Sequence, residues 1–579
     1  MTAAIYYHPE AYTTSGPKLM GRNAAGESFL RGYLQYSKAS EFWAQVQRME
    51  HAQHFAQTVK SFSRNEPVKA VDKNSLSALQ SPGLVYFPGP GIGEHAFHRA
   101  LAGANAQGFD PHTAWSLCGI THTTSSAGAM DALANLITSP VQPWDAVICT
   151  STAVKNNVEK LLQAQVNYLQ DRLGVSKLRL PLLPVIPLGI HTQDFVFTPE
   201  QRLLAKNSVG ADENTLVVLF MGRLSFHAKA HPLAMYQALQ SAALALKPSG
   251  KRVVLVECGW HANEHIQKSF EDAAKLACPD VQVITLDGRS AEHRQTAWAS
   301  ADVFCSLSDN IQETFGIVPI EAMAAGLPLV VSDWDGYKDT VRDGIDGYRI
   351  ATTMPQVGLA GDLAYRHAIE IDNYDMYCGH TSSLVAVDVQ AAAAAFEKLF
   401  GSESLRQTMG KAGRERAQTV YDWSVIIPQY EALWAEQTRL RMLARQKDAQ
   451  SSETTGKALL AHHWPARMDP FAAFASYPTH TLNENTLLVL KPQSLNASEL
   501  LEIQSQAVLQ VEAYRQLAMV NYAKQVLPTP EEVKHLIGNA ATTPKRAIDL
   551  LEGIEASRRP FVFRSLAWLM KLGVLGLAA

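Results

Sequence analysis

Two glutamates, Glu313 and Glu321, stand eight residues apart and enclose the segment ETFGIVPIE. The apolar, strand-like run DVFCSLS precedes this segment, and AMAAGLPLVVSD follows it. Pro319 and Gly326 stand where a helix typically starts and stops. The pattern therefore predicts a short helix that begins directly after a strand and a loop.

A helix start of this kind can bind an anion, because its first backbone N–H groups have no partner within the helix. Here these groups belong to the region of Phe315, Gly316 and Ile317. A diphosphate is the natural occupant. Glu321, about one turn inside the helix, could then accept hydrogen bonds from ribose hydroxyls.

Two cations follow another apolar strand-like run, in LFMGRLSFHAKAHP. Arg223 and Lys229 could neutralise the negative charge that grows on a departing diphosphate. Taken alone, an arginine and a lysine are more often solvated surface charges. Their place directly after a strand favours a binding role.

Together these segments resemble family 4 glycosyltransferases, which are retaining enzymes with the GT-B fold. Glu313 and Glu321 match the Glu-x7-Glu motif of that family, and ETFGIVPIEAMAAGLPLVVSD follows its pattern almost continuously. The resemblance covers roughly residues 1–440. It implies transfer of a sugar from a nucleotide-sugar donor with no metal and no cofactor. The donor-binding set that it implies is Gly21, Arg223, Lys229, Glu313, Thr314, Phe315, Gly316, Ile317 and Glu321.

By the same resemblance, Glu313 orients the transferred sugar, and Arg223 and Lys229 stabilise the leaving diphosphate. His122, in the strand end LCGITHTTSS, completes the implied catalytic set because related enzymes often carry a histidine near the sugar. A lone histidine is otherwise more often an interior residue. Gly21, in GPKLMGRNAAGESFL, matches the family's glycine-containing loop, although a plain turn explains it equally well.

Two glycine-containing segments invite a functional interpretation but do not require one. PGPGIGEH in the first half could be an acceptor loop, yet Pro and Gly build turns without any ligand. DGYKDTVRDGIDGYRI, after the Glu-x7-Glu segment, resembles the family and is interpreted chiefly as fold-building sequence.

Short apolar runs alternate with helical patterns through most of the first 440 residues, which is typical of parallel sheets covered by helices. We therefore expect an α/β protein with a mainly helical C-terminal extension. The resemblance implies the GT-B architecture, in which two Rossmann-like domains face a cleft. The expected parts are an acceptor-side domain (1–195), a donor domain (196–420), a helix packing back towards the first domain (421–445), a linker (446–457) and the extension (458–579).

Composition restricts the class of partner. The 579 residues carry a formal net charge of −4, which argues against a general nucleic-acid binder. The six cysteines show no Cys-x-x-Cys spacing and several lie in apolar runs, so we expect reduced core thiols and a cytoplasmic protein. We also expect no signal peptide and no membrane-spanning segment.

The last part of the chain, residues 558–579, is basic, aromatic and apolar, and it contains no acid. Such a segment can lie in a membrane interface, which would place the protein peripherally at the inner face of the membrane. A terminal helix docked on its own domain is the equal alternative. The acceptor is expected to be a saccharide or a lipid-linked molecule, in the synthesis of cell-envelope polysaccharide or glycolipid.

Two other functions remain open at this point. A sugar-nucleotide epimerase of the same fold would share the nucleotide site but would need acid and base residues placed about the sugar. A GT-B-like binding or scaffold protein would have lost catalysis. The joint presence of Glu313, Glu321, Arg223 and Lys229 favours the transferase.

Overall fold

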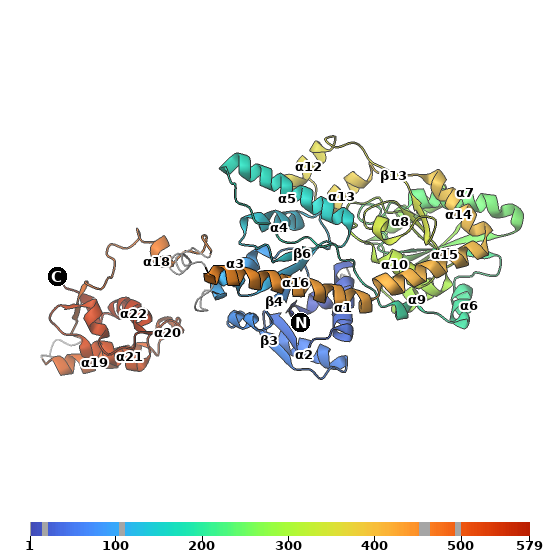
Figure 1. The fold of residues 1–579 in the computed structure, drawn as a ribbon. Coiled ribbons are helices and arrows are strands. Elements are labelled where there is room, and N and C mark those ends of the chain that lie inside the picture. Colours follow the sequence, from blue (N-terminus) through green and yellow to red (C-terminus); the bar gives the residue numbers. More distant parts are fainter. Residues whose placement is uncertain (1, 14–20, 104–109, 451–463, 493–498, 579) are drawn as a thin grey trace. The chain divides into compact units, whose positions relative to one another are not determined.

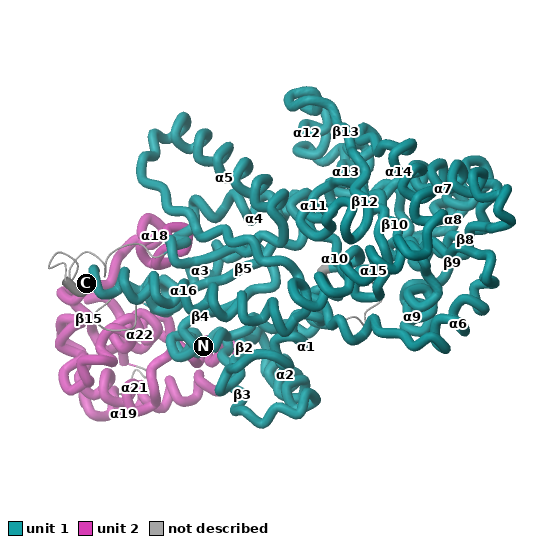
Figure 2. Tube along the Cα trace, turned by 45° about the vertical axis from the view of Figure 1, so that its right-hand side comes forward, with its two compact units in different colours: residues 1–464 teal, residues 465–579 magenta. Residues whose placement is uncertain are grey.

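The computed structural model describes residues 2–13, 21–103, 110–450, 464–492 and 499–578. The chain divides into two compact units, Met1–Trp464 and Pro465–Ala579, which are coloured separately in Figure 2. The first unit holds two six-stranded sheets and the second a small three-stranded sheet. None of the helices among these residues is long and apolar enough to cross a membrane.

The first sheet has the strand order β3-β2-β1-β4-β5-β6 and is parallel throughout. Sequential strands run outwards in both directions from β1, so the topological switch point lies between β1 and β4. The strands are β1 (Ala4–Tyr7), β2 (Phe42–Val46), β3 (Val68–Val71), β4 (Leu84–Tyr86), β5 (Ser116–Ile120) and β6 (Ala146–Ile148). The helices are α1 (Gly21–Tyr36), α2 (Met49–Ser61), α3 (Gly93–Gly103), α4 (Ala127–Thr138) and α5 (Thr152–Leu173).

The second sheet has the order β12-β11-β10-β7-β8-β9 and is also parallel. Its strands are β7 (Thr215–Met221), β8 (Arg252–Gly259), β9 (Gln282–Asp287), β10 (Val303–Ser306), β11 (Leu329–Ser332) and β12 (Gly347–Ile350). Its helices are α6 (Pro199–Ser208), α7 (Leu233–Leu246), α8 (Glu264–Ala277), α9 (Ala291–Ser300), α10 (Ile317–Ala324), α11 (Tyr337–Thr340), α14 (Val389–Gly401) and α15 (Glu403–Arg416). A hairpin of β13 (Thr352–Thr353) and β14 (Ala386–Val387) carries α12 (Gly361–Ala368) and α13 (Tyr374–Ser382).

Strand β7 shows why the sequence folds in this way. All seven residues of TLVVLFM are buried, because helices cover both faces of a parallel sheet. The expected GT-B architecture of two Rossmann-like domains is therefore confirmed, and Figure 1 shows the two domains side by side.

The chain links the two domains twice, and the two links are hydrogen-bonded to each other. Ile190 donates its N–H to Tyr421 O, and Trp423 donates its N–H to Ile190 O. The hydroxyl of Thr192 donates to Asp422 Oδ2 at 2.7 Å. The segment LPVIPLGI before the first link forms isolated bridges instead of a regular strand, because its prolines have no N–H to donate.

Helix α16 (Trp423–Gln450) follows the second link and contacts α1 and β5 of the first domain (Figure 1). Its Gln437 donates to Leu117 O at 2.9 Å and to Trp144 O at 3.0 Å. The helix continues to Gln450, so residues 446–450 of the predicted linker are helical. Residues 451–457 lie outside the described residues.

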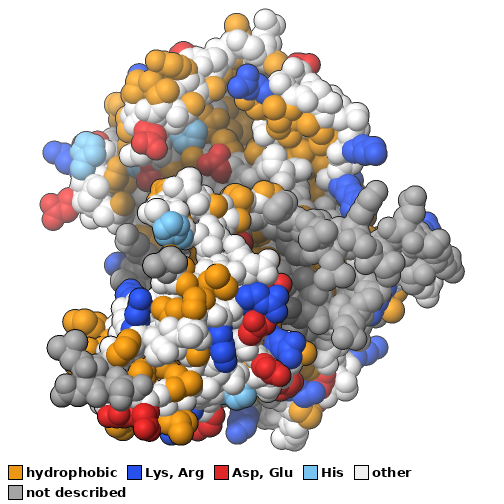
Figure 3. Space-filling model, turned by 90° about the vertical axis from the view of Figure 1, so that its left-hand side faces the viewer, with side chains coloured by type: hydrophobic (Ala, Val, Ile, Leu, Met, Phe, Trp, Pro, Cys, Tyr) orange, Lys and Arg blue, Asp and Glu red, His pale blue; other side chains and the backbone are white. Residues whose placement is uncertain are grey.

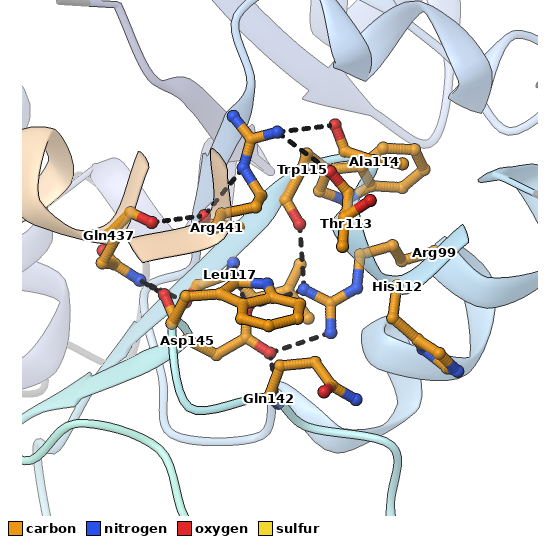
Figure 4. A network of polar contacts seen from close by, with 12 residues as sticks. Arg99, His112, Thr113, Ala114, Trp115, Leu117, Gln142, Asp145, Gln437 and Arg441 are labelled. Atoms are coloured by element: carbon orange, nitrogen blue, oxygen red, sulfur yellow. Dashed lines mark hydrogen bonds and ion pairs between the residues drawn. The ribbon is translucent and has the colours of Figure 1, made fainter. Parts of the chain in front are cut away.

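A fully buried ion pair lies beside these bonds, and Figure 4 shows it together with Gln437. The Asp145 carboxylate accepts from both terminal nitrogens of Arg99, at 2.7 and 2.8 Å. It also accepts from the N–H groups of Leu117 and Gln142, at 2.9 and 2.8 Å. The charge of Asp145 thus ties α3 to strand β5 and to the chain before β6.

The second unit is mainly helical, as the sequence predicts, but it also contains a small antiparallel sheet of order β16-β15-β17. Strands of two to four residues are too short to show an alternating pattern, which is why the sequence showed no strand rhythm. The elements are α18 (Pro470–Ala473), β15 (Leu487–Leu490), α19 (Leu500–Tyr514), α20 (Ala518–Asn521), α21 (Pro530–Asn539), β16 (Lys545–Arg546), α22 (Arg559–Lys571) and β17 (Leu575–Leu577).

Within the described part of the basic C-terminal segment, residues 558–578, several apolar side chains belong to the core of this unit. Val562, Leu566 and Leu569 on α22 are fully buried, whereas Phe561 is 48% exposed. This burial agrees with the alternative of a terminal helix docked on its own domain. Figure 3 shows one face of the whole molecule, on which Lys and Arg side chains lie among Asp and Glu side chains.

Candidate active site

The switch point of the second sheet lies between β10 and β7, which are neighbours in the sheet although β8 and β9 separate them in the chain. In open parallel sheets the loops at the carboxyl ends of the two strands flanking this point form the binding crevice. Arg223 and Lys229 lie after β7, and Glu313 lies after β10. The fold thus brings the two predicted cations and the first glutamate of the motif to one place.

Lys229 and Glu313 form an ion pair in which Lys229 Nζ donates to Glu313 Oε2. The side chain of Lys229 is 17% exposed and that of Glu313 is 8% exposed. The other oxygen of Glu313 accepts from the N–H of Thr314 at 3.3 Å. The Lys229 ammonium group is thus held in a mostly buried position. An anion that enters the site can compete with the Glu313 carboxylate for this lysine.

The loop that carries Lys229 is held by three consecutive residues after β10. Asn310 Nδ2 donates to His227 O at 2.9 Å, and Asp309 Oδ1 accepts from the N–H of His231 at 3.2 Å. Ser308 Oγ donates to Lys229 O at 3.4 Å. All three residues are buried. Their hydrogen bonds connect the loop after β7 to the loop after β10 and so fix the position of the Lys229 backbone.

Arg223 lies at the start of the same loop, where its Nη2 donates to Ala228 O at 2.7 Å. Gly222 allows the chain to leave β7 here, because its φ is +145° and a Cβ would stand 3.4 Å from Cε of Lys229. The loop therefore curls back over the end of its own strand, with Arg223 and Lys229 on one short stretch.

Helix α10 begins as the sequence predicts, with Gly316 at its N-cap and Pro319 in its first turn. Gly316 has a φ of +77°, and a Cβ there would stand 2.0 Å from the ring of Tyr337, so only glycine fits. Phe315 is buried, with 1% of the residue exposed, so its ring belongs to the core. Ile317 is the first residue of the helix.

Glu321 lies in the second turn of α10 and is half-buried. Burial raises the pKa of Glu321 to about 7, against the opposing attraction of Arg294 and Lys229. Arg294 on α9 donates to Gly288 O at 2.8 Å. Sequence reasoning missed Arg294, because a single arginine inside a helix carries no motif.

The predicted residues of the first domain are placed differently from one another. The carbonyl of His122, two residues after β5, accepts from the Thr314 hydroxyl at 3.0 Å. Gly21 is the exposed first residue of α1, and residues 14–20 before it lie outside the described residues. The structure therefore brings the His122 carbonyl to the loop between β10 and α10, residues 307–316, which we call the donor loop after its predicted role. Among the described residues, no hydrogen bond joins this loop to Gly21.

A further acid, Asp335, lies beside the site after β11. Its φ is +44°, which is rare for a residue with a side chain, and its Oδ1 lies 3.4 Å from Ser151 Oγ. Burial raises the pKa of Asp335 well above its ordinary value, and nearby Glu313 adds to the effect. The segment DGYKDTV, interpreted from sequence as fold-building, thus also contributes to the site.

Among the residues that the structure describes, no group of three or more His, Cys, Asp or Glu side chains is placed to hold a metal ion. All six cysteines are free and buried.

A buried glutamate behind the site makes stability depend on pH. Burial raises the pKa of Glu257 on β8 to about 7, and its carboxyl accepts from Tyr236 Oη at 2.6 Å. The folded state therefore retains a proton that the unfolded state releases, and stability falls as the pH rises from about 4.5 through 7. Glu257→Gln is expected to remove about 2 to 3 kcal/mol of this loss, as thermal unfolding at pH 5 and pH 8 would show.

Glu397→Gln, at an exposed position on α14, is the matched control and is expected to leave the pH dependence unchanged. The same pH dependence in Glu257→Gln and in the wild type would refute the burial argument.

The chain is similar to known proteins over part of its length. Residues 201–359 match the family described as "Glycosyl transferases group 1". Among curated relatives, the chain is 27% identical over 248 residues to a D-inositol 3-phosphate glycosyltransferase of Mycolicibacterium vanbaalenii, covering 41% of this chain and 49% of the relative. It is 27% identical over 191 residues to a lipopolysaccharide 1,2-N-acetylglucosaminetransferase of Salmonella typhimurium, covering 32% and 48%. The matches span about half the length of these relatives.

Among solved structures, Anabaena Alr3699/HepE in complex with UDP is 14% identical and has a TM-score of 0.48, with 75% of this chain and 100% of that chain covered. Sucrose-phosphate synthase from Thermosynechococcus elongatus is 16% identical with a TM-score of 0.39, covering 78% and 99%. The assignment of the fold rests on strand order. Residues 201–359, which match the glycosyl transferases group 1 model, lie in the second Rossmann-like domain of the GT-B architecture.

Proposed function

We propose that the protein is a retaining glycosyltransferase of family 4 that moves a sugar from a nucleoside diphosphate sugar to an acceptor hydroxyl. One observation carries the proposal: the Lys229–Glu313 pair lies at the switch point of the donor-domain sheet, next to the start of α10. A cation and a helix start together suit a diphosphate, and Glu321 one turn further suits a ribose.

In the proposed reaction, Lys229 forms an ion pair with the donor diphosphate in place of Glu313. The Glu313 carboxylate can then accept hydrogen bonds from the sugar hydroxyls. The bond between the anomeric carbon and the phosphate oxygen breaks, and its electron pair leaves with the nucleoside diphosphate. Arg223, Lys229 and the start of α10 stabilise the charge that develops. No metal is needed for this step, because these groups supply the positive charge.

The acceptor oxygen attacks from the face that the leaving group vacates, so the anomeric configuration is retained. Its proton passes to the departing phosphate oxygen, and no side chain acts as a covalent nucleophile. Similarity to a lipopolysaccharide 1,2-N-acetylglucosaminetransferase supports a saccharide or lipid-linked acceptor. We place the reaction in the cytoplasm, in the synthesis of cell-envelope glycan.

A screen of UDP-, GDP-, ADP- and dTDP-sugars tests this function. Nucleoside diphosphate release is measured with and without cell-envelope extract, for the wild type and for Glu321→Gln. We expect release from one donor class, stimulated by acceptor and lowered about tenfold or more in the variant. NMR of the product checks retention.

Two results would overturn the proposal. Conversion of the donor to an epimer, with the diphosphate still attached, would identify an isomerase. Tight nucleotide-sugar binding without turnover, with or without extract, would identify a binding protein.

A further inference from the structure

Among the hydrogen bonds between the first domain and the second, two reach Thr314 in the donor loop after β10 and one reaches Asp339 on α11. The bond from Ser151 is buried, the bond to His122 is part-buried, and the bond from Thr152 is exposed. Ser151 Oγ donates to Thr314 O at 2.7 Å, and Thr314 Oγ1 donates to His122 O at 3.0 Å. The N–H of Thr152 donates to Asp339 Oδ2 at 2.6 Å. His122 follows β5, and Ser151 and Thr152 begin α5. These contacts come from the carboxyl ends of two neighbouring strands of the first sheet.

Thr314 is the residue through which these contacts reach the site. Its carbonyl and its hydroxyl are bound by the first domain, and its N–H is bound by the side chain of Glu313. Thr314 is 6% exposed as a residue, and Ser151 is fully buried. Losing either contact would leave a largely buried polar group without this partner, which is unfavourable.

The start of α5 strengthens the same junction. Ser151 is the N-cap of this 22-residue helix and accepts from the N–H of Val154 at 3.2 Å. The carboxylate of Asp339 faces the positive end of the helix dipole, which is a favourable position for an acid. Gly336 lies against the backbone of Phe315, where a Cβ would stand 2.5 Å from the Phe315 Cα. The loops after β10 and β11 are thus pressed together at this junction.

We propose that Ser151 and Thr314 are positioning residues, through which the first domain holds Glu313 and the start of α10 in the geometry that sugar transfer requires. This inference rests on the function proposed above. It makes the reactive geometry depend on closure of the two domains. Transfer needs the anomeric carbon and the acceptor oxygen within about 3 to 3.5 Å of each other. The loop that carries Glu313 is positioned for this step only when the first domain contacts Thr314.

The test uses Thr314→Val, which keeps the shape of the side chain and removes its hydroxyl, and Thr314→Ser, which restores the hydroxyl. Ser151→Ala removes the bond to Thr314 O together with the N-cap of α5 and the longer contact with Asp335. Thr314→Val leaves these three contacts of Ser151 in place and so separates the role of Thr314 from these effects. The matched control is Ser402→Ala, which removes an N-cap serine from α15 within the donor domain.

We expect kcat to fall about 10- to 100-fold in Thr314→Val and Ser151→Ala, while the Kd for the nucleoside diphosphate alone changes less than about threefold. Thr314→Ser should regain kcat to within about threefold of the wild type, and Ser402→Ala should keep it. Hydrolysis of the donor should gain relative to transfer, because a poorly set loop excludes water less well.

Amide hydrogen exchange in the segment 313–318 provides a readout that needs no turnover. It should be faster in Thr314→Val and Ser151→Ala than in the wild type and in Ser402→Ala. Unchanged kcat in both variants, or equal losses in Ser151→Ala and Ser402→Ala, would overturn the inference while a working wild type leaves the proposed function standing. A wild type inactive with every donor would refute the function instead, and exchange would still decide whether the first domain holds the loop.

Discussion

Replacing Lys229 by alanine is expected to lower kcat/KM for sugar transfer by about 100- to 1000-fold. The lysine lies at the switch point of the donor sheet, paired with Glu313 in a site where both side chains are mostly buried. Little water is present to screen the charge of a leaving diphosphate, so a single cation has a large effect on the transition state. Initial rates with the donor identified by the screen would measure the change.

Lys229→Ala also leaves Glu313 without its partner, so thermal unfolding and circular dichroism must show that the variant is folded at the assay temperature. Lys251→Ala, at an exposed position before β8, is the matched control and should retain full activity. Activity of Lys229→Ala within about threefold of the wild type would rule out a role for this lysine at the diphosphate.

Asp145→Asn is expected to destabilise the first domain by about 3 to 5 kcal/mol. The carboxylate accepts four hydrogen bonds. Neither its side chain nor that of its partner Arg99 has any exposed surface. The amide that replaces it removes the negative charge, so the guanidinium remains buried without compensation (Figure 4). Thermal unfolding should show a midpoint lowered by about 10 °C.

The comparison variant for this prediction is Arg439→Ala, which breaks the exposed pair with Glu436 on the same helix that carries Gln437. Exposed pairs contribute about 0 to 1 kcal/mol, so its midpoint should scarcely move. Hydrogen exchange should locate the loss in β5 and β6, where Leu117 and Gln142 bond to Asp145. Equal midpoints for Asp145→Asn and the wild type would show that the buried pair adds nothing.

Much of the local structure of the candidate site could be predicted from the sequence, because the signals there are local. Gly316 must be glycine for its φ of +77°, and Pro319 and Gly326 mark the start and end of one short helix. These residues and the apolar strand before them lie within about 25 positions of each other. The prediction of the second Rossmann-like domain rested on the same short-range patterns.

Other residues could not be found in this way. Asn310 is one amide in a loop until the fold places it 2.9 Å from His227 O, 83 positions earlier in the chain. Arg294 resembles any helix arginine until it is seen near Glu321. The three-stranded sheet of the second unit pairs Leu488 with Leu577 across 89 positions, so no local pattern announces it.

The sequence by itself determined the class of fold and the start of α10, since periodicity and turn chemistry act between near neighbours. It also indicated Lys229 and Glu313 as candidate charged groups of the site. Only the tertiary structure decided that Lys229 meets Glu313, and that Ser151 and His122 of the other domain bind Thr314. The physical reason is that strand order sets which loops adjoin at the end of a sheet. That order depends on the packing of whole layers, which no short stretch of sequence encodes.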